Sequence, residues 1–294
     1  MNWDDLQYFS ALAGTGSLSA AARALGVEHA TVARRISALE ASLGIGLVDR
    51  RGRRWTLTAE GEHIAAIALR MGQEAQAAQR SARGAQTELA GIVTLSAPPA
   101  LAAACLTQPL ANLQKRHPGL VIRIRGEVRM ASLEHSEADI AMRMSRPEKG
   151  DLTRLKLGDV HFKLYASPGY TADTTETDWR FIGSDGELSQ APQQRALADY
   201  AAGRPFVMQA NSMELQASAT RAGAGIAALP EFMAHEQPAL AEVRPGHVLM
   251  SREVWLVVHT DIKRAAPVRA VMEQVREAWR EFHTRAERHS HNTA

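Results

Sequence analysis

The sequence predicts an all-helical, basic N-terminal module, then one long helix, then a larger α/β domain arranged in two lobes. Three observations predict this order. Arginines cluster between residues 23 and 54, proline is absent from residues 58–91, and short strands and helices alternate after Gly91. A chain of 294 residues is long enough for roughly two domains, and strands that alternate with helices are typical of an open α/β sheet.

The composition of the chain excludes several classes of protein. With 45% hydrophobic residues the chain can bury real cores, which excludes a disordered chain. Its 34 Lys and Arg against 32 Asp and Glu leave a net charge of +2, which excludes a chain coated in positive charge along its length. The single cysteine, Cys105, cannot form an internal disulfide, and its apolar surroundings predict an inert thiol.

No segment of the sequence predicts export or insertion into a membrane. The first residues, Met1–Asp5, are acidic and lack the apolar stretch of a signal peptide. No run approaches the ~18 apolar residues that suggest a membrane-spanning helix, because Ser96, Pro98 and Pro99 interrupt the best candidate. We therefore expect a soluble, cytoplasmic protein without a membrane partner.

The first 60 residues predict three helices and a short ribbon. Apolar residues at helical spacing predict the first helix, and Ser17 or Ser19 can cap the second. A third helix runs from about His29 to Leu43, and a ribbon follows over residues 47–57. The glycines expected to end these helices are Gly14 and Gly16, Gly26, and Gly44.

Residues 59–90 predict a linker helix that pairs with a second copy of the chain. Small or apolar residues recur at intervals of four and three, which is the spacing of a heptad seam. These residues are Ile64, Ala68, Met71, Ala75, Ala78, Ala82, Ala85 and Leu89. The alternative is a long helix that lies on its own domain.

The remainder of the chain predicts strands and helices in alternation. The predicted strands are residues 92–97, 120–126, 139–144, 155–157, 161–166, 206–209, 225–228 and 253–259. The predicted helices are residues 99–116, 195–202, 213–222 and 267–284, with a polar connection over 171–178 and a frayed tail over 285–294.

Small and aliphatic residues in the first module favour a helix-turn-helix. Ala22 lets two helices approach, Gly26 follows in the turn, and Val32 and Ile36 hold the second helix. Seven arginines between residues 23 and 54 oppose three carboxylates, so 7 − 3 leaves a net charge of +4. Several of these arginines flank a tight turn at Gly52 and form a wing that can reach DNA phosphates.

The run from Ser17 to Gly61 closely resembles the winged helix-turn-helix of LysR-type transcriptional regulators. The matching residues are Ala21, Ala22, Leu25, Arg34, Ile36, Leu39, Glu40, Leu43, Gly44, Leu47, Arg50, Arg53 and Leu57–Gly61. The chain differs from the family at Glu28-His29-Ala30, Ala33 and Val48. The resemblance implies that these positions face the DNA groove, so we expect them to bear on which bases are read rather than on whether DNA is bound.

Four later segments are similar to the same family's effector domain, which resembles periplasmic binding proteins. These segments are Ala138–Arg143, Tyr165–Tyr170, Ala222–Pro230 and Val254–Val257. The resemblance implies two α/β lobes joined by two crossover strands. It divides the chain into a DNA-binding domain (1–58), a linker helix (59–90) and an effector domain (91–294). Lobe I then covers about 91–162 and 262–294, and lobe II about 163–261.

The resemblance implies a sequence-specific regulator of transcription that binds double-stranded promoter DNA. We expect His29, Thr31 and Arg34, on the first turns of the recognition helix, to read bases in the major groove. Phosphate contacts are expected from Arg34 or Arg35 and from three wing residues. The wing residues are Arg50, Arg53 and Arg54.

The family resemblance also implies a small-molecule effector bound in the cleft between the lobes. The expected residues are Ser96 and the helix start at Pro99 and Ala100, which face Asn211 and Ser212. Because a helix N-terminus favours an anion, an organic acid is the expected ligand. The alternative for Ser212 is a simple N-cap. We also expect a homodimer or homotetramer and a contact with RNA polymerase.

No motif predicts catalysis, a cofactor or a metal site. The eleven histidines form no His-Glu-x-x-His pair, and no Gly-x-Ser-x-Gly elbow occurs. Gly223-Ala224-Gly225 follows a predicted helix and precedes a predicted strand, which indicates a helix cap and turn rather than a nucleotide loop. Two alternatives remain for the whole chain: an enzyme built on the α/β half with an accessory DNA-binding module, or an architectural protein that binds DNA without reading its sequence.

Overall fold

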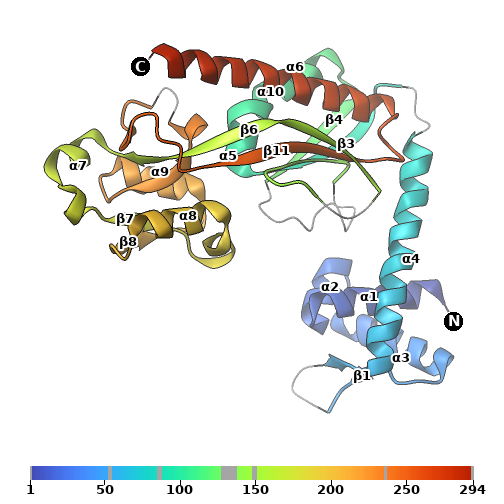
Figure 1. Cartoon of the computed structure of the whole chain (residues 1–294). Coiled ribbons are helices and arrows are strands. Elements are labelled where there is room, and N and C mark those ends of the chain that lie inside the picture. Colours follow the sequence, from blue (N-terminus) through green and yellow to red (C-terminus); the bar gives the residue numbers. More distant parts are fainter. Residues whose placement is uncertain are drawn as a thin grey trace. The chain divides into compact units, whose positions relative to one another are not determined.

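The computed structural model describes residues 2–51, 55–84, 88–126, 138–147, 151–234 and 237–292. The chain forms two compact units, Met1–Ala82 and Arg83–Ala294. Figure 1 draws the first unit in blue to cyan and the second in teal to red, and each unit has its own hydrophobic core.

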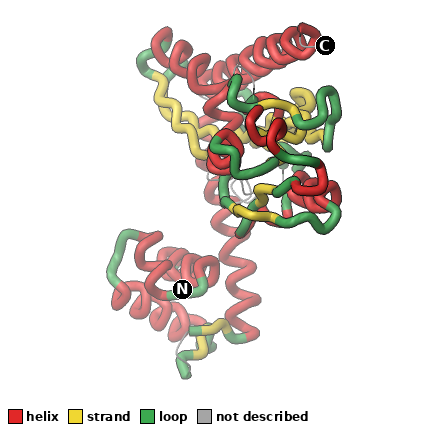
Figure 2. The backbone as a smooth tube through the Cα atoms, turned by 90° about the vertical axis from the view of Figure 1, so that its left-hand side faces the viewer, coloured by secondary structure: helices red, strands yellow, loops and turns green. Residues whose placement is uncertain are grey.

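The first unit is a bundle of three helices with a short β ribbon and a fourth, longer helix. Helices α1 (Trp3–Thr15), α2 (Leu18–Leu25) and α3 (His29–Leu43) pack around one apolar cluster. Strands β1 (Val48–Asp49) and β2 (Thr56–Leu57) pair antiparallel, and α4 (Ala59–Gly84) follows them. Figure 2 shows these helices in red and the ribbon in yellow.

Local sequence sets the ends of these helices as predicted, except that Gly14 lies inside α1 and Gly16 alone ends it. The Ala20 amide donates a hydrogen bond of 3.2 Å to Ser17 Oγ, so Ser17 caps α2. Gly16, Gly26 and Gly44 end α1, α2 and α3 with φ of 67°, 65° and 71°. Glycine adopts this left-handed conformation without the steric cost of a Cβ, so a glycine at each end stops the helix.

The first turns of α4 belong to the core of their own unit. Ala68 is buried, and Ile64 and Met71 pack against the cluster that α1–α3 enclose. Ala75 and Ala78, the next positions of the heptad seam, follow beyond that cluster. Ala85 lies outside the described residues, and Leu89, the last predicted seam position, lies in a bend after α4 and packs against the core of the second unit, so the predicted helix does not reach residue 90. The alternative of a helix lying on its own domain is therefore correct for the first turns, and pairing with a second copy stays a prediction for the later ones.

The second unit is built on a seven-stranded mixed sheet. Its strands are β3 (Gly91–Ala97), β4 (Leu120–Gly126), β5 (Ile140–Arg143), β6 (Leu152–Ala166), β9 (Ala227–Pro230), β10 (Ala241–Glu242) and β11 (Met250–His259). Their order is β10-β6-β11-β5-β3-β4, and β9 also pairs with β6. Strand β3 is parallel to β4 and β5, whereas β11 is antiparallel to β5 and β6. A separate parallel pair joins β7 (Phe181–Gly183) to β8 (Phe206–Gln209).

Helices pack against these strands. Helix α5 (Pro99–Leu101), a π-helical stretch (Ala102–Leu106) and α6 (Thr107–Arg116) follow one another without a break, and α10 (Ala266–Asn292) packs beside them (Figure 1). The other helices are α7 (Pro168–Asp173), α8 (Pro192–Ala201) and α9 (Met213–Arg221). Short 3-10 turns lie at Glu176–Asp178, Gly186–Gln190 and Glu231–Met233.

Separate cores divide the second unit into two lobes. The first core includes Ile140 and Trp279, and the second lobe has clusters of its own around residues such as Phe181. Strand β6 passes between them, since Phe162 packs in the first core and Leu164 in the second. The predicted crossing of the chain between two lobes is thus visible in one continuous strand.

The structure differs from the predicted elements at several places, and it contains α7, β7 and β10, which the sequence pattern does not predict. The predicted strands 155–157 and 161–166 form one strand of 15 residues, because the residues between them stay paired with β11. The predicted connection 171–178 holds the end of α7 and a 3-10 turn. Helix α10 continues through the predicted frayed tail to Asn292, since neither glycine nor proline interrupts residues 268–292.

Candidate nucleic-acid interface and effector site

Helix α3 buries one face and exposes the other. Val32, Ile36 and Leu39 recur at helical spacing and are fully buried in the unit's core. His29 and Arg34 are exposed, and Thr31 is half-buried. The residues predicted to read bases therefore have side chains that reach, at least in part, the solvent side of the helix. Val48, which the family resemblance also placed toward the DNA groove, is instead buried in the core of this unit at 8% exposure.

The two adjacent arginines of α3 have different surroundings. Arg35 Nη1 donates to Oδ1 of the buried Asp5 at 3.1 Å, and its guanidinium lies 5.6 Å from the centroid of the Tyr8 ring. Arg34 is exposed, and in the described part of the chain it has no hydrogen-bond or ion-pair partner. Arg35 is thus tied to α1, while the Arg34 guanidinium is available to a ligand outside the fold.

Glu40 and Arg50 fasten the ribbon to α3. Glu40 Oε1 accepts hydrogen bonds from the amides of residues 47 and 48 at 2.8 and 3.1 Å. Its other oxygen accepts from Arg50 Nη2 at 2.5 Å, and the Arg50 guanidinium lies 4.7 Å from the ring of Trp55. This network fixes the Arg50 guanidinium relative to α3.

The tip of the wing is described only in part. Arg53 and Arg54, both predicted to contact phosphates, lie outside the described residues. Arg51, which the sequence pattern does not single out, is highly exposed and donates from Nη2 to Asp49 Oδ2 at 2.6 Å. Hydrogen bonds from Arg51 lower the pKa of Asp49 to about 2, since they stabilise the charged carboxylate.

Thr58 joins the ribbon to the start of α4. Its Oγ1 donates to the Gly46 carbonyl oxygen at 2.8 Å and accepts from the Gly61 amide at 2.9 Å. The first hydrogen bond ties α4 to the turn after α3, and the second caps the helix. The matching run Leu57–Gly61 therefore holds the wing and the long helix in one arrangement.

In the second unit, Ser96 lies buried near the end of β3 beside a buried cation. Arg143, the last residue of β5 and 3% exposed, donates to Ser96 Oγ at 2.8 Å and to the Ser96 carbonyl oxygen at 3.1 Å. A buried guanidinium is costly unless it is hydrogen-bonded. The sequence pattern does not single out Arg143 as a site residue. The feature that could have indicated it is an arginine at the end of an otherwise nearly apolar strand.

The two predicted helix starts lie beside one apolar cluster. Ala100, near the start of α5, and Met213, the first residue of α9, both pack against the core of the first lobe. Asn211 is exposed, and Ser212 Oγ accepts from the amide three residues later at 3.2 Å. Ser212 is therefore an N-cap, as its alternative interpretation predicted. Pro99 is exposed at the first position of α5.

Two cavities of the second unit are lined by other residues. One, of about 510 Å³, opens on the second lobe around Tyr200 and Arg244. The other, of about 680 Å³, lies between α6 and α10 and reaches Cys105. Burial raises the pKa of the Cys105 thiol to about 12, so the thiol is protonated at neutral pH and unreactive.

The described residues also bear on whether the chain has a metal site, a membrane-spanning helix or a nucleotide loop. Across these residues, no three His, Cys, Asp or Glu side chains are placed to hold a metal ion. None of the helices seen in the same ranges has the length and apolar character needed to cross a membrane. Gly223 and Gly225 lie between α9 and β9, which confirms the predicted turn.

Two protein families together match most of the chain. Residues 3–62 match the family described as "Bacterial regulatory helix-turn-helix protein, lysR family". Residues 86–280 match the family described as "LysR substrate binding domain".

Known relatives resemble the chain over its length. The Mau operon transcriptional activator of Paracoccus denitrificans is 26% identical over 263 residues, which cover 90% of this chain and 91% of that protein. The full-length structure of the Vibrio cholerae virulence activator AphB is 23% identical, with a TM-score of 0.59 over 94% of this chain and 98% of that one. LysG from Corynebacterium glutamicum, with bound effector Arg, is 20% identical, with a TM-score of 0.54 over 96% and 99%. The two solved structures show a shared fold.

Proposed function

This chain belongs to the LysR family of bacterial transcriptional regulators, and on that premise we propose which of its residues read DNA and which sense a ligand. It carries the helix-turn-helix DNA-binding domain and the effector-binding domain of that family. In our proposal α3 lies in the major groove of promoter DNA, where Arg34 is the main base-reading cation. His29 and Thr31, on the first turn of the same helix, contact neighbouring bases or phosphates.

The observation that carries this proposal is the contrast between Arg34 and Arg35. Arg35 engages its guanidinium with Asp5 and Tyr8, so it stabilises the fold more than it binds DNA. Arg34 is exposed beside the buried stripe of α3 and keeps its donors free of partners among the described residues. A guanidinium with free donors can bind the O6 and N7 atoms of a guanine together, which is the commonest base-specific contact.

The wing supplies sequence-independent affinity in this proposal. Arg50, held by Glu40 and Trp55, presents its charge at a fixed place beside α3. In the sequence, Arg51, Arg53 and Arg54 follow Arg50 and add positive charge to this segment. Each phosphate contact releases counterions from DNA, so the affinity falls as salt concentration rises.

The second unit senses a small organic acid between its lobes in this proposal. Ser96 with Arg143, and the helix starts at Pro99 and Ala100 and at Asn211, supply the polar groups. LysG was solved with bound effector Arg, which supports a small molecule as the effector class.

The ligand acts on the oligomer in this proposal. A homodimer or homotetramer has two arrangements, and the ligand shifts the population toward the arrangement that it binds more tightly. We further propose cytoplasmic action, contact with RNA polymerase and no catalytic activity.

Replacement of Arg34 tests the base-reading role. If Arg34 binds a guanine through two hydrogen bonds, Arg34→Ala should bind its best site about 10- to 100-fold more weakly and should lose preference at that base. Arg70→Ala, which removes an exposed arginine of α4, should keep the wild-type preference. Selection of bound duplexes from a random library, followed by fluorescence anisotropy at one salt concentration, measures both quantities. An unchanged base preference in Arg34→Ala would contradict the proposal.

A further inference from the structure

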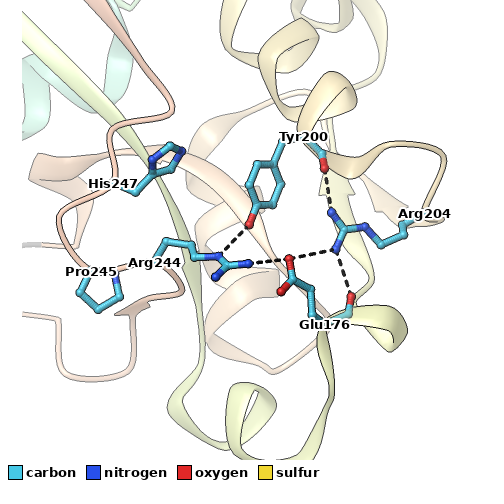
Figure 3. Close-up of a pocket in the computed structure, with 6 residues that line it drawn as sticks. All are labelled: Glu176, Tyr200, Arg204, Arg244, Pro245 and His247. Carbon is cyan, nitrogen blue, oxygen red and sulfur yellow. Dashed lines mark hydrogen bonds and ion pairs between the residues drawn. The ribbon is translucent and has the colours of Figure 1, made fainter.

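The cavity on the second lobe has a chemistry that the proposed function leaves unused. Its volume is about 510 Å³, and three separate segments line it (Figure 3). Glu176 comes from the 3-10 turn after α7, Tyr200 and Arg204 from the end of α8 and the turn after it, and Arg244, Pro245 and His247 from the chain between β10 and β11. None of the residues proposed for the cleft between the lobes lies in this lining.

Arg204 forms one wall of the cavity and has a structural role. Its Nε donates to the Ala201 carbonyl oxygen at 2.8 Å, and its Nη2 donates to the Tyr200 carbonyl oxygen at 2.7 Å. Its Nη1 donates to the Glu176 carbonyl oxygen at 3.0 Å. All three nitrogens are therefore engaged, and the guanidinium covers Phe181 at 5.1 Å from the ring centroid.

Arg244 is held from one side and open on the other. Its Nε donates to Tyr200 Oη at 3.2 Å, and its Nη2 donates to Glu176 Oε1 at 2.5 Å. Its guanidinium also lies 5.6 Å from the centroid of the Trp179 ring. In the ranges that the structure describes, no residue accepts a hydrogen bond from Nη1, and 47% of the side chain is exposed. A guanidinium already fixed in this way loses little further conformational entropy when it binds a ligand.

The remaining groups favour a planar anion. Two guanidinium groups and one carboxylate, 2 − 1, give the lining a charge of +1 with His247 neutral. Tyr200 and His247 place their rings 6.5 Å apart and tilted by 37°, so they form an aromatic wall next to Arg244 (Figure 3). The Glu176 carboxylate, 54% exposed, shows where a carboxylate sits against Arg244. A ligand carboxylate that enters the cavity must compete with Glu176 for the Arg244 guanidinium.

We propose that this cavity is a second ligand site, separate from the cleft between the lobes, and that it binds an aromatic carboxylate. The ligand carboxylate accepts hydrogen bonds from Arg244, including its Nη1, and the ring packs on Tyr200, His247 and Pro245. Charge-assisted pairing of carboxylate with guanidinium fixes the acid group, and contact with the rings selects an aromatic body. The site therefore distinguishes aromatic acids from neutral or aliphatic analogues.

The test uses benzoate as the probe and the full chain without DNA, so it does not depend on the DNA-reading proposal. Wild-type protein should bind benzoate in the millimolar range or tighter, with cyclohexanecarboxylate weaker and benzamide weaker still. Arg244→Gln should weaken benzoate binding about tenfold or more, since it removes the charged donor. Glu176→Gln should strengthen binding several-fold, because it removes the competing carboxylate. Isothermal titration calorimetry and ligand-observed NMR measure these changes.

Two matched variants distinguish binding in this cavity from binding in the cleft or at any exposed arginine. Arg221→Gln removes an exposed arginine of α9 outside the cavity, and it should leave benzoate binding unchanged. Ser96→Ala alters the proposed cleft and should also leave it unchanged. The proposal is overturned if the wild type does not bind benzoate, if Arg244→Gln binds as well as wild type, or if Glu176→Gln binds more weakly. Loss of binding in Ser96→Ala with full binding in Arg244→Gln would place benzoate in the cleft instead.

Discussion

At residue 61 the fold leaves no room for a side chain. A Cβ on Gly61 would lie 2.1 Å from the Leu47 carbonyl oxygen and 3.2 Å from Thr58 Oγ1. The obstructing oxygen at 2.1 Å belongs to the backbone, which cannot move aside as the end of a flexible side chain can. Gly61 is therefore required for close contact between the ribbon and α4.

Replacement of Gly61 should show this requirement as a loss of stability. Gly61→Ala should lower the free energy of unfolding by about 2 kcal/mol or more, because the ribbon must shift away from α4. Gly72→Ala is the matched control, since Gly72 lies in the same helix and a Cβ there meets nothing within 4 Å. It should stabilise by about 0.5–1 kcal/mol, because alanine favours the helix. Urea unfolding followed by circular dichroism measures the free energy of unfolding of both variants. Equal values for Gly61→Ala and Gly72→Ala would contradict the close packing of Gly61 against the Leu47 backbone.

Single residues could be predicted from the sequence where their cause is local. Ser17 and the helix-ending glycines act on backbone within a few residues, so their pattern is visible in the sequence. Arg35 pairs with Asp5, 30 residues away, and Arg143 with Ser96, 47 residues away. No periodicity links such partners, so the sequence could not show which arginine of α3 is free to bind DNA.

At the scale of an element, α4 changes role along its length. Its first turns pack on α1–α3, while Ala75 and Ala78 continue the same seam beyond that core. A stripe of small residues suits close approach of a second helix. This later part of the seam is where we expect the dimer contact.

Charge placed on this seam should weaken self-association. The double variant Ala75→Glu with Ala78→Glu should raise the dimer dissociation constant by about tenfold or more, because carboxylates in a helix interface lose their hydration. Ala66→Glu adds charge on an exposed position away from the seam and should leave association unchanged. Analytical ultracentrifugation of the full chain measures the dissociation constant. If the double variant and Ala66→Glu had the same dimer dissociation constant, α4 would not pair with a second copy at Ala75 and Ala78.

Elements were predictable where the pattern within a segment decides their type. Strand β8 and the start of β4 follow the predicted boundaries, since turn residues flank both. The predicted gap at residues 158–160 is strand, because pairing with β11 overrides the weak local preference of Gly158. The predicted frayed tail is helical for a local reason, since its own sequence holds no glycine or proline that would end α10.

For the whole molecule, the net charge of +2 conceals an uneven distribution. The first unit carries the cluster of +4 between residues 23 and 54, and the rest of the chain is nearly balanced. The helix-turn-helix and the lobed α/β unit could be predicted because their motifs are contiguous in the sequence. The cavity of Glu176, Tyr200 and Arg244 could not, because the fold assembles it from three segments far apart in the chain.

Footprinting on the DNA that flanks its own gene examines the regulator as a whole. We expect protection of an interrupted palindrome whose half-sites are spaced by whole helical turns of about 10 base pairs, as two copies of α3 in successive major grooves require. Protection should weaken as salt concentration rises but should stay at the same bases. Protection spread evenly over any duplex, without a preferred sequence, would contradict the proposal that α3 reads bases and would favour an architectural DNA-binding protein.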